Sequence, residues 1–124
     1  KDPKLAMAEM HLSNSVFVEK IVKNTQKTSK ANEIKNKGSS AETIVADFAL
    51  AGAAEQVAAE ANQKLGGIDI LINNAAILDF IRFEDQHPER IAQMIQTNVT
   101  ALIQLTHAIL PSFKAAGQGQ FVMI

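Results

Sequence analysis

The chain has 124 residues, of which 47% are hydrophobic and 20% charged, a size and balance typical of one soluble globular domain. Its net charge of −1 excludes the clustered basic surface of a nucleic-acid-binding protein, and its apolar runs are too short to cross a bilayer. Cysteine is absent, which excludes disulfides and thiolate metal ligands and fits a reducing compartment, so our default location is cytoplasmic.

The first part of the chain predicts two helices and two strands. Residues 4–12, KLAMAEMHL, are mostly helix formers and predict a helix. Residues 16–18 are β-branched or aromatic and predict a short strand. The lysine-rich stretch 21–37 predicts a solvated helix closed by a glycine. A second strand is predicted through 43–45, and it ends at Asp47.

The remainder predicts the same alternation of helix and strand. Apolar residues at helical spacing predict a helix over 54–65, and a strand follows at 68–72. Residues 78–87 read as a loop, residues 88–116 as one long helix, and residues 121–124 as a fourth strand. Such alternation predicts a single α/β domain over the whole chain, a three-layer parallel sheet with helices on both faces.

The polar residues at the strand exits are the candidate site. In open parallel sheets a ligand binds beyond the carboxyl ends of the strands. The residues predicted there are Glu19, Lys20, Asp47, Asn73, Asn74, Ala75 and Ala76. Paired amides offer donors and acceptors together, and small neighbours let a flat ligand approach the backbone. Plainer explanations exist for each: asparagine forms turns, an aspartate caps the following helix, and a glutamate can be solvated.

Four stretches resemble the short-chain dehydrogenase/reductase family. IDILINNAAI resembles the NNAG strand exit of that family, with Ala76 where most members have glycine. IVADF resembles the strand that ends in an adenine-binding aspartate, QTNVTALIQLTHAILPSF the long interface helix, and GQFVMI the next strand. The four also stand at the family's spacing. The resemblance covers residues 41–124 and extends less specifically from Ser15.

The resemblance implies a dinucleotide-binding, Rossmann-like domain and a role for each exit residue. Asp47 would accept a hydrogen bond from the adenine amino group, with the Phe48 backbone beside it. The residues implied to line the ribose and nicotinamide are Asn74, Ala75 and Ala76. Asn73 would mainly brace the sheet. Glu19 would bind the adenosine ribose hydroxyls and repel a 2′-phosphate, whereas Lys20 could accept one. The cofactor is therefore NAD or NADP, with a slight preference for NAD.

Asn98 is the implied catalytic residue. The apolar positions 91, 95, 102, 105 and 109 form a narrow seam on the long helix, and Asn98 lies on that seam. An unpaired buried amide costs about 1–3 kcal/mol, so Asn98 must find partners. The resemblance implies that it holds a water in a proton relay. The alternative is a buried amide that fixes helix register. No metal site is expected, because the histidines lack metal-ligand spacing.

Two pieces of the family pattern are not in this chain. No glycine precedes Gly38, so a glycine-rich phosphate turn would lie upstream of Lys1. The catalytic serine and the YxxxK pair would lie beyond Ile124, and the chain has no tyrosine. We therefore expect an incomplete domain, strands 2 to 5 of the family fold, that is inactive alone. Without the central strand the isolated chain should also be poorly stable, because backbone groups would face a gap.

The sequence thus predicts part of an NAD(P)-dependent oxidoreductase, which transfers hydride between a nicotinamide cofactor and a small alcohol or carbonyl substrate. We expect the complete protein to be a homo-oligomer through helix 88–116, with neither nucleic acid nor membrane as a partner. A second apolar set on that helix, Met94, Ala101 and Ala108, could face a partner helix. The alternative is a non-catalytic dinucleotide-fold module for binding or oligomerisation.

Overall fold

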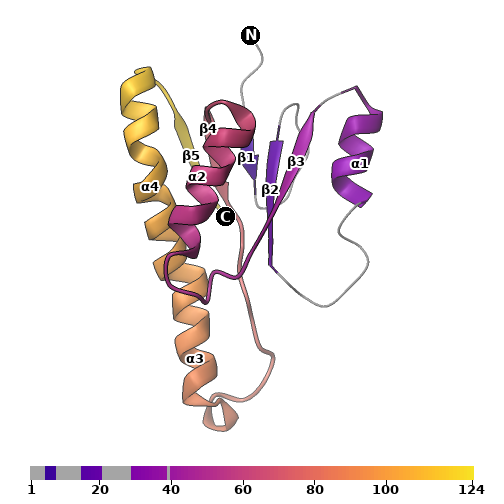
Figure 1. Cartoon of the computed structure of the whole chain (residues 1–124). Helices are drawn as coiled ribbons and strands as arrows, with labels where there is room; N and C mark the ends of the chain where they lie inside the picture. The colour runs from indigo at the N-terminus through magenta and orange to yellow at the C-terminus, as the bar shows by residue number, and fades with distance from the viewer. Residues whose placement is uncertain (1–4, 8–14, 21–28, 39) are drawn as a thin grey trace.

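The structure, a computed structural model, describes residues 5–7, 15–20, 29–38 and 40–124 (Figure 1). Its elements in chain order are β1 (Leu5–Met7), β2 (Ser15–Lys20), α1 (Ser29–Asn36), β3 (Ala41–Ala46), α2 (Ala53–Leu65), β4 (Ile70–Asn73), the 3₁₀ turn η1 (Phe83–Asp85), α3 (Pro88–Ile95), the π-helical segment η2 (Gln96–Thr100), α4 (Ala101–Ala116) and β5 (Gln120–Met123).

The strands form one parallel sheet in the order β3-β2-β1-β4-β5. Because every pair is parallel, all carboxyl ends meet at one edge of the sheet, where β3 and β4 release the chain into their exit loops. The predicted α/β fold class is confirmed.

The helix predicted for residues 4–12 is wrong where the structure describes it, because Leu5–Met7 is the central strand. β1 pairs on both sides: Leu5 stands opposite Ser15 of β2 and opposite Ile70 of β4. Non-local pairing along both edges outweighs the helix propensity of the segment. The gap predicted between two strand pairs is therefore filled, so the sheet is not limited to strands 2 to 5. The predicted instability rested on that gap and loses its basis.

Helices cover both faces of the sheet, as predicted. Ala41 and Ile44 of β3 are buried in separate clusters, Ala41 with Ile34 of α1 and Ile44 with residues of α2 and α4. Residues three apart on a strand point to opposite faces. α1 therefore lies on one face, while α2 and α4 pack together on the other (Figure 1).

The main core lies between the sheet and the α2–α4 pair. The α2 residues in it are small, namely Ala53, Ala54, Val57, Ala58 and Ala61. Small side chains let α2 approach α4 and the sheet closely, which suits a chain with few aromatic residues. Phe113 of α4 and Phe121 of β5 close one end, with ring centroids 4.8 Å apart.

Several predicted boundaries shift. β2 runs to Lys20, so Glu19 and Lys20 lie within the strand opposite β3 and do not follow it. The predicted helix 21–37 is observed over Ser29–Asn36, and residues 21–28 lie outside the described residues. The predicted helix 88–116 is divided into α3, η2 and α4, and it continues past Pro111 to Ala116.

The predicted apolar seam is only partly correct. Leu105 and Ile109 are buried, but Ile95 is 56% exposed. The buried face instead begins at Thr97 and continues through Ala101 to Phe113 at every fourth residue. A π-helical turn adds about one residue per turn to the α-helical repeat, which shifts the face of the helix that meets the core.

Candidate functional site

The exit of β3 is a turn closed by Asp47. Its Oδ1 accepts a hydrogen bond from the Ala49 N–H at 3.0 Å, and its carbonyl accepts one from the Leu50 N–H at 3.0 Å. The carboxylate therefore caps the turn after β3, and α2 begins later, after Gly52. The plainer explanation of Asp47 as the cap of the following helix is wrong, because the N-cap of α2 is Gly52 and Asp47 instead bonds within the turn before it. Its predicted contact with adenine stays a prediction.

Phe48 ties the same turn to the helix that contains Asn98. Its side chain is buried in the main core, and its backbone carbonyl accepts a hydrogen bond from Gln96 Nε2 at 3.5 Å. Gln96 is the first residue of η2, two positions before Asn98. The exit of β3 thus lies against the π-helical segment.

At the end of β4, Asn73 is buried and braces three elements. Its Nδ2 donates to Thr106 Oγ1 of α4 at 3.0 Å and to Met123 Sδ of β5 at 3.3 Å. Its carbonyl accepts from the Ile124 N–H at 3.0 Å. The bracing role predicted for Asn73 is confirmed.

The next three residues change from partly buried to exposed. Asn74 is half-buried, Ala75 packs against the main core, and Ala76 is exposed. The last two positions both carry small side chains, and only Ala76 is exposed. Their predicted contacts with ribose and nicotinamide stay predictions.

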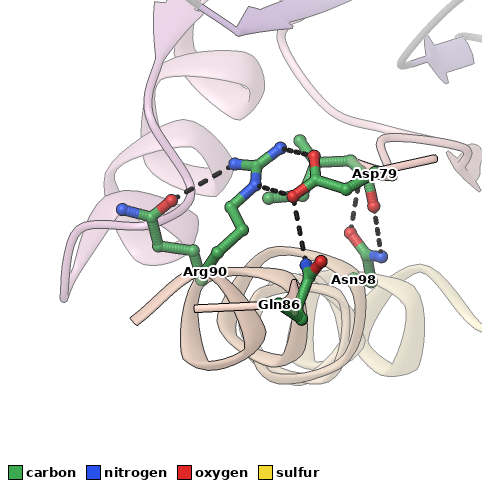
Figure 2. A network of polar contacts seen from close by, with 6 residues as sticks. Asp79, Gln86, Arg90 and Asn98 are labelled. Atoms are coloured by element: carbon green, nitrogen blue, oxygen red, sulfur yellow. Dashed lines mark hydrogen bonds and ion pairs between the residues drawn. The ribbon is translucent and has the colours of Figure 1, made fainter. Parts of the chain in front are cut away.

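Asn98 holds the backbone just beyond this exit. Its Oδ1 accepts from the Ile77 N–H and its Nδ2 donates to the Ile77 carbonyl, both at 2.9 Å (Figure 2). The two bonds copy the pairing of a neighbouring strand, so both polar atoms of the amide are engaged. Asn98 therefore has the partners that a half-buried amide requires, and they lie on the strand-exit loop. Its catalytic role is untested and stays a prediction.

Glu19 stands opposite Val45 in the parallel pair of β2 and β3. The position places it one residue before the end of β2, at the edge of the sheet that also carries Asp47. Its side chain lies outside what the structure describes, so the predicted contact with the adenosine ribose stays a prediction.

A second set of side-chain contacts, not predicted from the sequence, holds the same loop to the helix that follows it. We call the Asn98–Ile77 and Asp79–Arg90 contacts the two fastenings of the loop. Asp79 accepts two hydrogen bonds from Arg90 of α3, from Nε to Oδ2 and from Nη2 to Oδ1, each at 2.7 Å (Figure 2). Gln86 Nε2 donates to Asp79 Oδ2 at 3.1 Å, and Arg90 Nη1 donates to Gln93 Oε1 at 3.2 Å. The hydrogen bonds from Arg90 lower the pKa of Asp79, and Asp79 in turn raises the pKa of Arg90.

Two groups stand out among the large apolar side chains that are exposed. The first group lies in the loop between β4 and α3 and consists of Leu78, Phe80, Ile81 and Phe83. The second is a stripe on the long helix, with Ile95, Val99, Ile103 and Leu110. The predicted partner-facing set differs from this stripe, since Ala101 is buried and Ala108 packs against the core.

Within the described residues, no group of three or more His, Cys, Asp or Glu side chains is placed to hold a metal ion. None of the helices described is both long and apolar enough to span a bilayer. Thr97 Oγ1 is the buried side-chain polar atom without a hydrogen-bond partner in the described part of the chain.

A sequence model of the short chain dehydrogenase family matches residues 5–124. The chain belongs to the short-chain dehydrogenase family. Among curated members, it is 34% identical over 79 residues to D-beta-hydroxybutyrate dehydrogenase of Cupriavidus necator. The match covers 64% of this chain and 31% of that relative, so this short-chain dehydrogenase sequence spans about a third of the relative's length.

Solved structures show the same fold. A metagenomic short-chain oxidoreductase in complex with NADP superposes with a TM-score of 0.77 at 24% identity, over 90% of this chain and 50% of the other. An NADH-dependent reductase complexed with NAD gives 0.74 at 17% identity, over 90% and 48%. At such identities the likeness establishes the fold of this short-chain dehydrogenase chain, and the cofactors belong to those proteins.

Proposed function

We propose that this chain is part of an NAD(P)-dependent oxidoreductase that transfers hydride between a nicotinamide cofactor and a small alcohol or carbonyl substrate. The observation that carries the proposal is the pair of contacts that joins both strand exits to η2. Gln96 holds the β3 exit through Phe48, and Asn98 holds the β4 exit through Ile77. Residues assigned to one groove by family resemblance thus come from segments that contact one another.

The residues of this chain can account for contacts with the nicotinamide, its ribose and the adenine, but not with the pyrophosphate. The exposed Ala76 and the small Ala75 leave room for a ribose and a nicotinamide beside the β4 exit. Asp47 uses Oδ1 for its turn, and its Oδ2 would accept from the adenine amino group. No glycine precedes Gly38, so this chain does not supply a glycine-rich turn for the pyrophosphate. When bound, the cofactor supplies the hydride, and the protein orients it and handles the proton.

The proposed role of Asn98 in the proton relay needs a specific atom. Oδ1 and Nδ2 each make one hydrogen bond to the Ile77 backbone, which fixes the orientation of the amide. The π-helical bonding of η2 departs from the regular α-helical pattern, and such turns are frequent at functional sites. We assign the water to a main-chain carbonyl of η2, with the Asn98 side chain holding that segment against the β4 exit.

Glu19 favours NAD in this proposal. A carboxylate near the end of β2 would accept from the ribose hydroxyls and would repel a 2′-phosphate. Lys20 is adjacent and favours NADP. We keep the slight preference for NAD, because the family resemblance implies that Glu19 binds the ribose hydroxyls.

The isolated 124-residue chain is proposed to be inactive. It contains no tyrosine, so it has no phenol to serve as the general acid of the family mechanism. The specific alternative for the isolated chain is nucleotide binding without turnover. A cytoplasmic location stays a prediction from the sequence.

The test is a titration of the full-length protein with NADH and with NADPH, in which binding is measured by calorimetry or fluorescence. Asp47→Asn keeps an oxygen for the Ala49 N–H but loses the charged acceptor for adenine. Loss of one charge-assisted hydrogen bond should raise the dissociation constant about tenfold. Asp85→Asn, an exposed change in η1, is the control. Failure of the wild-type protein to bind either dinucleotide would refute the proposed function.

We also propose that the complete protein is a homo-oligomer through helix 88–116. The support is the exposed apolar stripe along that helix, in which Ile103 is 59% exposed. Ile103→Glu should shift the sedimentation coefficient toward the monomer, whereas Gln104→Glu on the same helix should not. A monomeric wild-type protein would refute this part.

A further inference from the structure

The loop that leaves β4 is fastened twice to the helix that follows it. Asn98 of η2 holds Ile77, and Arg90 of α3 holds Asp79, two residues further along (Figure 2). The loop therefore runs along the helix from η2 toward the start of α3, and its path is set at both points. Beyond the second point the chain turns through η1 and enters α3.

The second fastening has the geometry of a specific contact. Both guanidinium donors meet both carboxylate oxygens at 2.7 Å, which is the bidentate arrangement with the strongest directional preference among ion pairs. Gln86 and Gln93 add one bond each, so the carboxylate and the guanidinium are each held from a third side. The two side chains are 23% and 32% exposed, so solvent reaches them only partly.

The same loop contains an ion pair that lacks these features. Arg82 and Glu84 pair in the exposed part of the loop, with side chains 79% and 59% exposed. Exposed pairs contribute little because water solvates both charges when they separate. The loop thus contains one partly buried bidentate pair, Asp79–Arg90, and one exposed pair, Arg82–Glu84, which can serve as its control.

We propose that Asp79 and Arg90 are positioning residues that set the path of the β4 exit loop, and through it the backbone of Ala75 and Ala76 against which the nicotinamide half of the cofactor lies. The inference rests on the proposed function. The pair acts through the loop, and neither residue is assigned a contact with the cofactor. Asn98 holds Ile77, which directly follows the cofactor-facing Ala76, and Arg90 holds Asp79 two residues later. The two contacts together fix both ends of the segment 77–79.

The location of the pair predicts which half of a dinucleotide it affects. Asp79 fastens the β4 exit, where the nicotinamide half is proposed to lie. The adenosine half is proposed at the exits of β2 and β3, which the Asp79–Arg90 pair does not touch. A displaced β4 exit should therefore weaken the whole dinucleotide and leave an adenosine monophosphate fragment unaffected. General loss of structure would weaken both.

The experiment uses the full-length protein and measures dissociation constants for NADH, NADPH and adenosine 5′-monophosphate. Arg90→Gln should raise the dissociation constant for the dinucleotide about tenfold, which corresponds to the loss of one or two hydrogen bonds at the displaced backbone. The constant for the monophosphate should stay unchanged. Arg90→Lys keeps the charge but not the bidentate fork and should give an intermediate value. Arg82→Gln is the matched control and should change neither constant.

Asp79→Asn provides a second route if Arg90→Gln does not fold, because it preserves size and one acceptor oxygen. Amide hydrogen exchange over residues 74–79 should become faster in both variants and remain unchanged in Arg82→Gln. An unchanged dinucleotide constant in a folded variant would overturn the inference, and so would an equal loss for dinucleotide and monophosphate. Wild-type protein that binds neither dinucleotide would instead refute the proposed function, and this inference with it.

Discussion

Replacing Asn98 by alanine removes both atoms that hold the Ile77 backbone at 2.9 Å. Each hydrogen bond contributes about 1 kcal/mol net, and alanine leaves a half-buried N–H and a half-buried carbonyl without these partners. We therefore expect Asn98→Ala to lower the free energy of unfolding by about 2 kcal/mol. In proteins of roughly 150–250 residues a loss of that size lowers the Tm by about 4–8 °C, and the shift is larger in shorter chains.

The variant Asn98→Asp tests the two hydrogen bonds separately. A carboxylate still accepts from the Ile77 N–H, but it places an oxygen where Nδ2 now meets the Ile77 carbonyl. Two acceptors would then face each other, so the aspartate variant should be at least as unstable as the alanine variant. The orientation of the amide follows from the same pairing, since a flipped amide would set donor against donor and acceptor against acceptor.

The assay is urea unfolding of the full-length protein, with Gln104→Ala as the control because it removes an amide from α4 without affecting the Ile77 backbone. Hydrogen exchange of the Ile77 amide should accelerate in Asn98→Ala. Turnover should fall if the amide holds η2 in place for the proton relay, and dinucleotide affinity should fall as well, because Ile77 adjoins the cofactor-facing Ala76. A loss below about 0.5 kcal/mol, with unchanged exchange at Ile77, would refute the reasoning.

Three further outcomes are expected. Gly119→Ala would place a Cβ on ring carbons of the buried Phe113, so it should destabilise the protein by about 1–3 kcal/mol in thermal unfolding. Asn73→Ala and Thr106→Val should show a coupling of about 1 kcal/mol in a double-mutant cycle, because their side chains share one hydrogen bond. Protection of the β4 exit loop should be full above the ordinary carboxyl pKa and be lost as the pH falls through the lowered pKa of Asp79, whereas Asp79→Asn should show no such step in hydrogen exchange.

The strand exits were predictable because buried parallel strands appear in the sequence as short apolar runs that end in polar residues. Asp47 and Asn73 were located on that basis, and the structure places both at the expected edge of the sheet. What the sequence did not reveal is their partners. The Ala49 N–H and the Thr106 hydroxyl become visible only once turn geometry and helix packing are known.

β1 escaped prediction for a different reason. A strand of three residues gives no detectable alternation, and Leu5–Met7 consists of residues that favour helices. Its conformation is set by β2 and β4, which lie 8 or more positions away in the chain and pair with it from both sides. The Asp79–Arg90 pair is non-local in the same sense: the two charges lie eleven positions apart across a loop, so no periodic pattern connects them.

The π-helical segment η2 explains both why the predicted apolar seam was partly wrong and why Asn98 contacts the strand-exit loop. On an uninterrupted helix the seam at positions 91, 95, 98 and 102 would have placed Asn98 in the core, where its amide would need polar partners among apolar side chains. The π-helical turn of η2 shifts the buried face to Thr97 and Ala101 instead. Asn98 then lies beside that face, half-buried, and its amide meets the strand-exit loop (Figure 2). The extra residue that breaks the predicted seam is therefore what allows a helix side chain to act as a strand partner for Ile77.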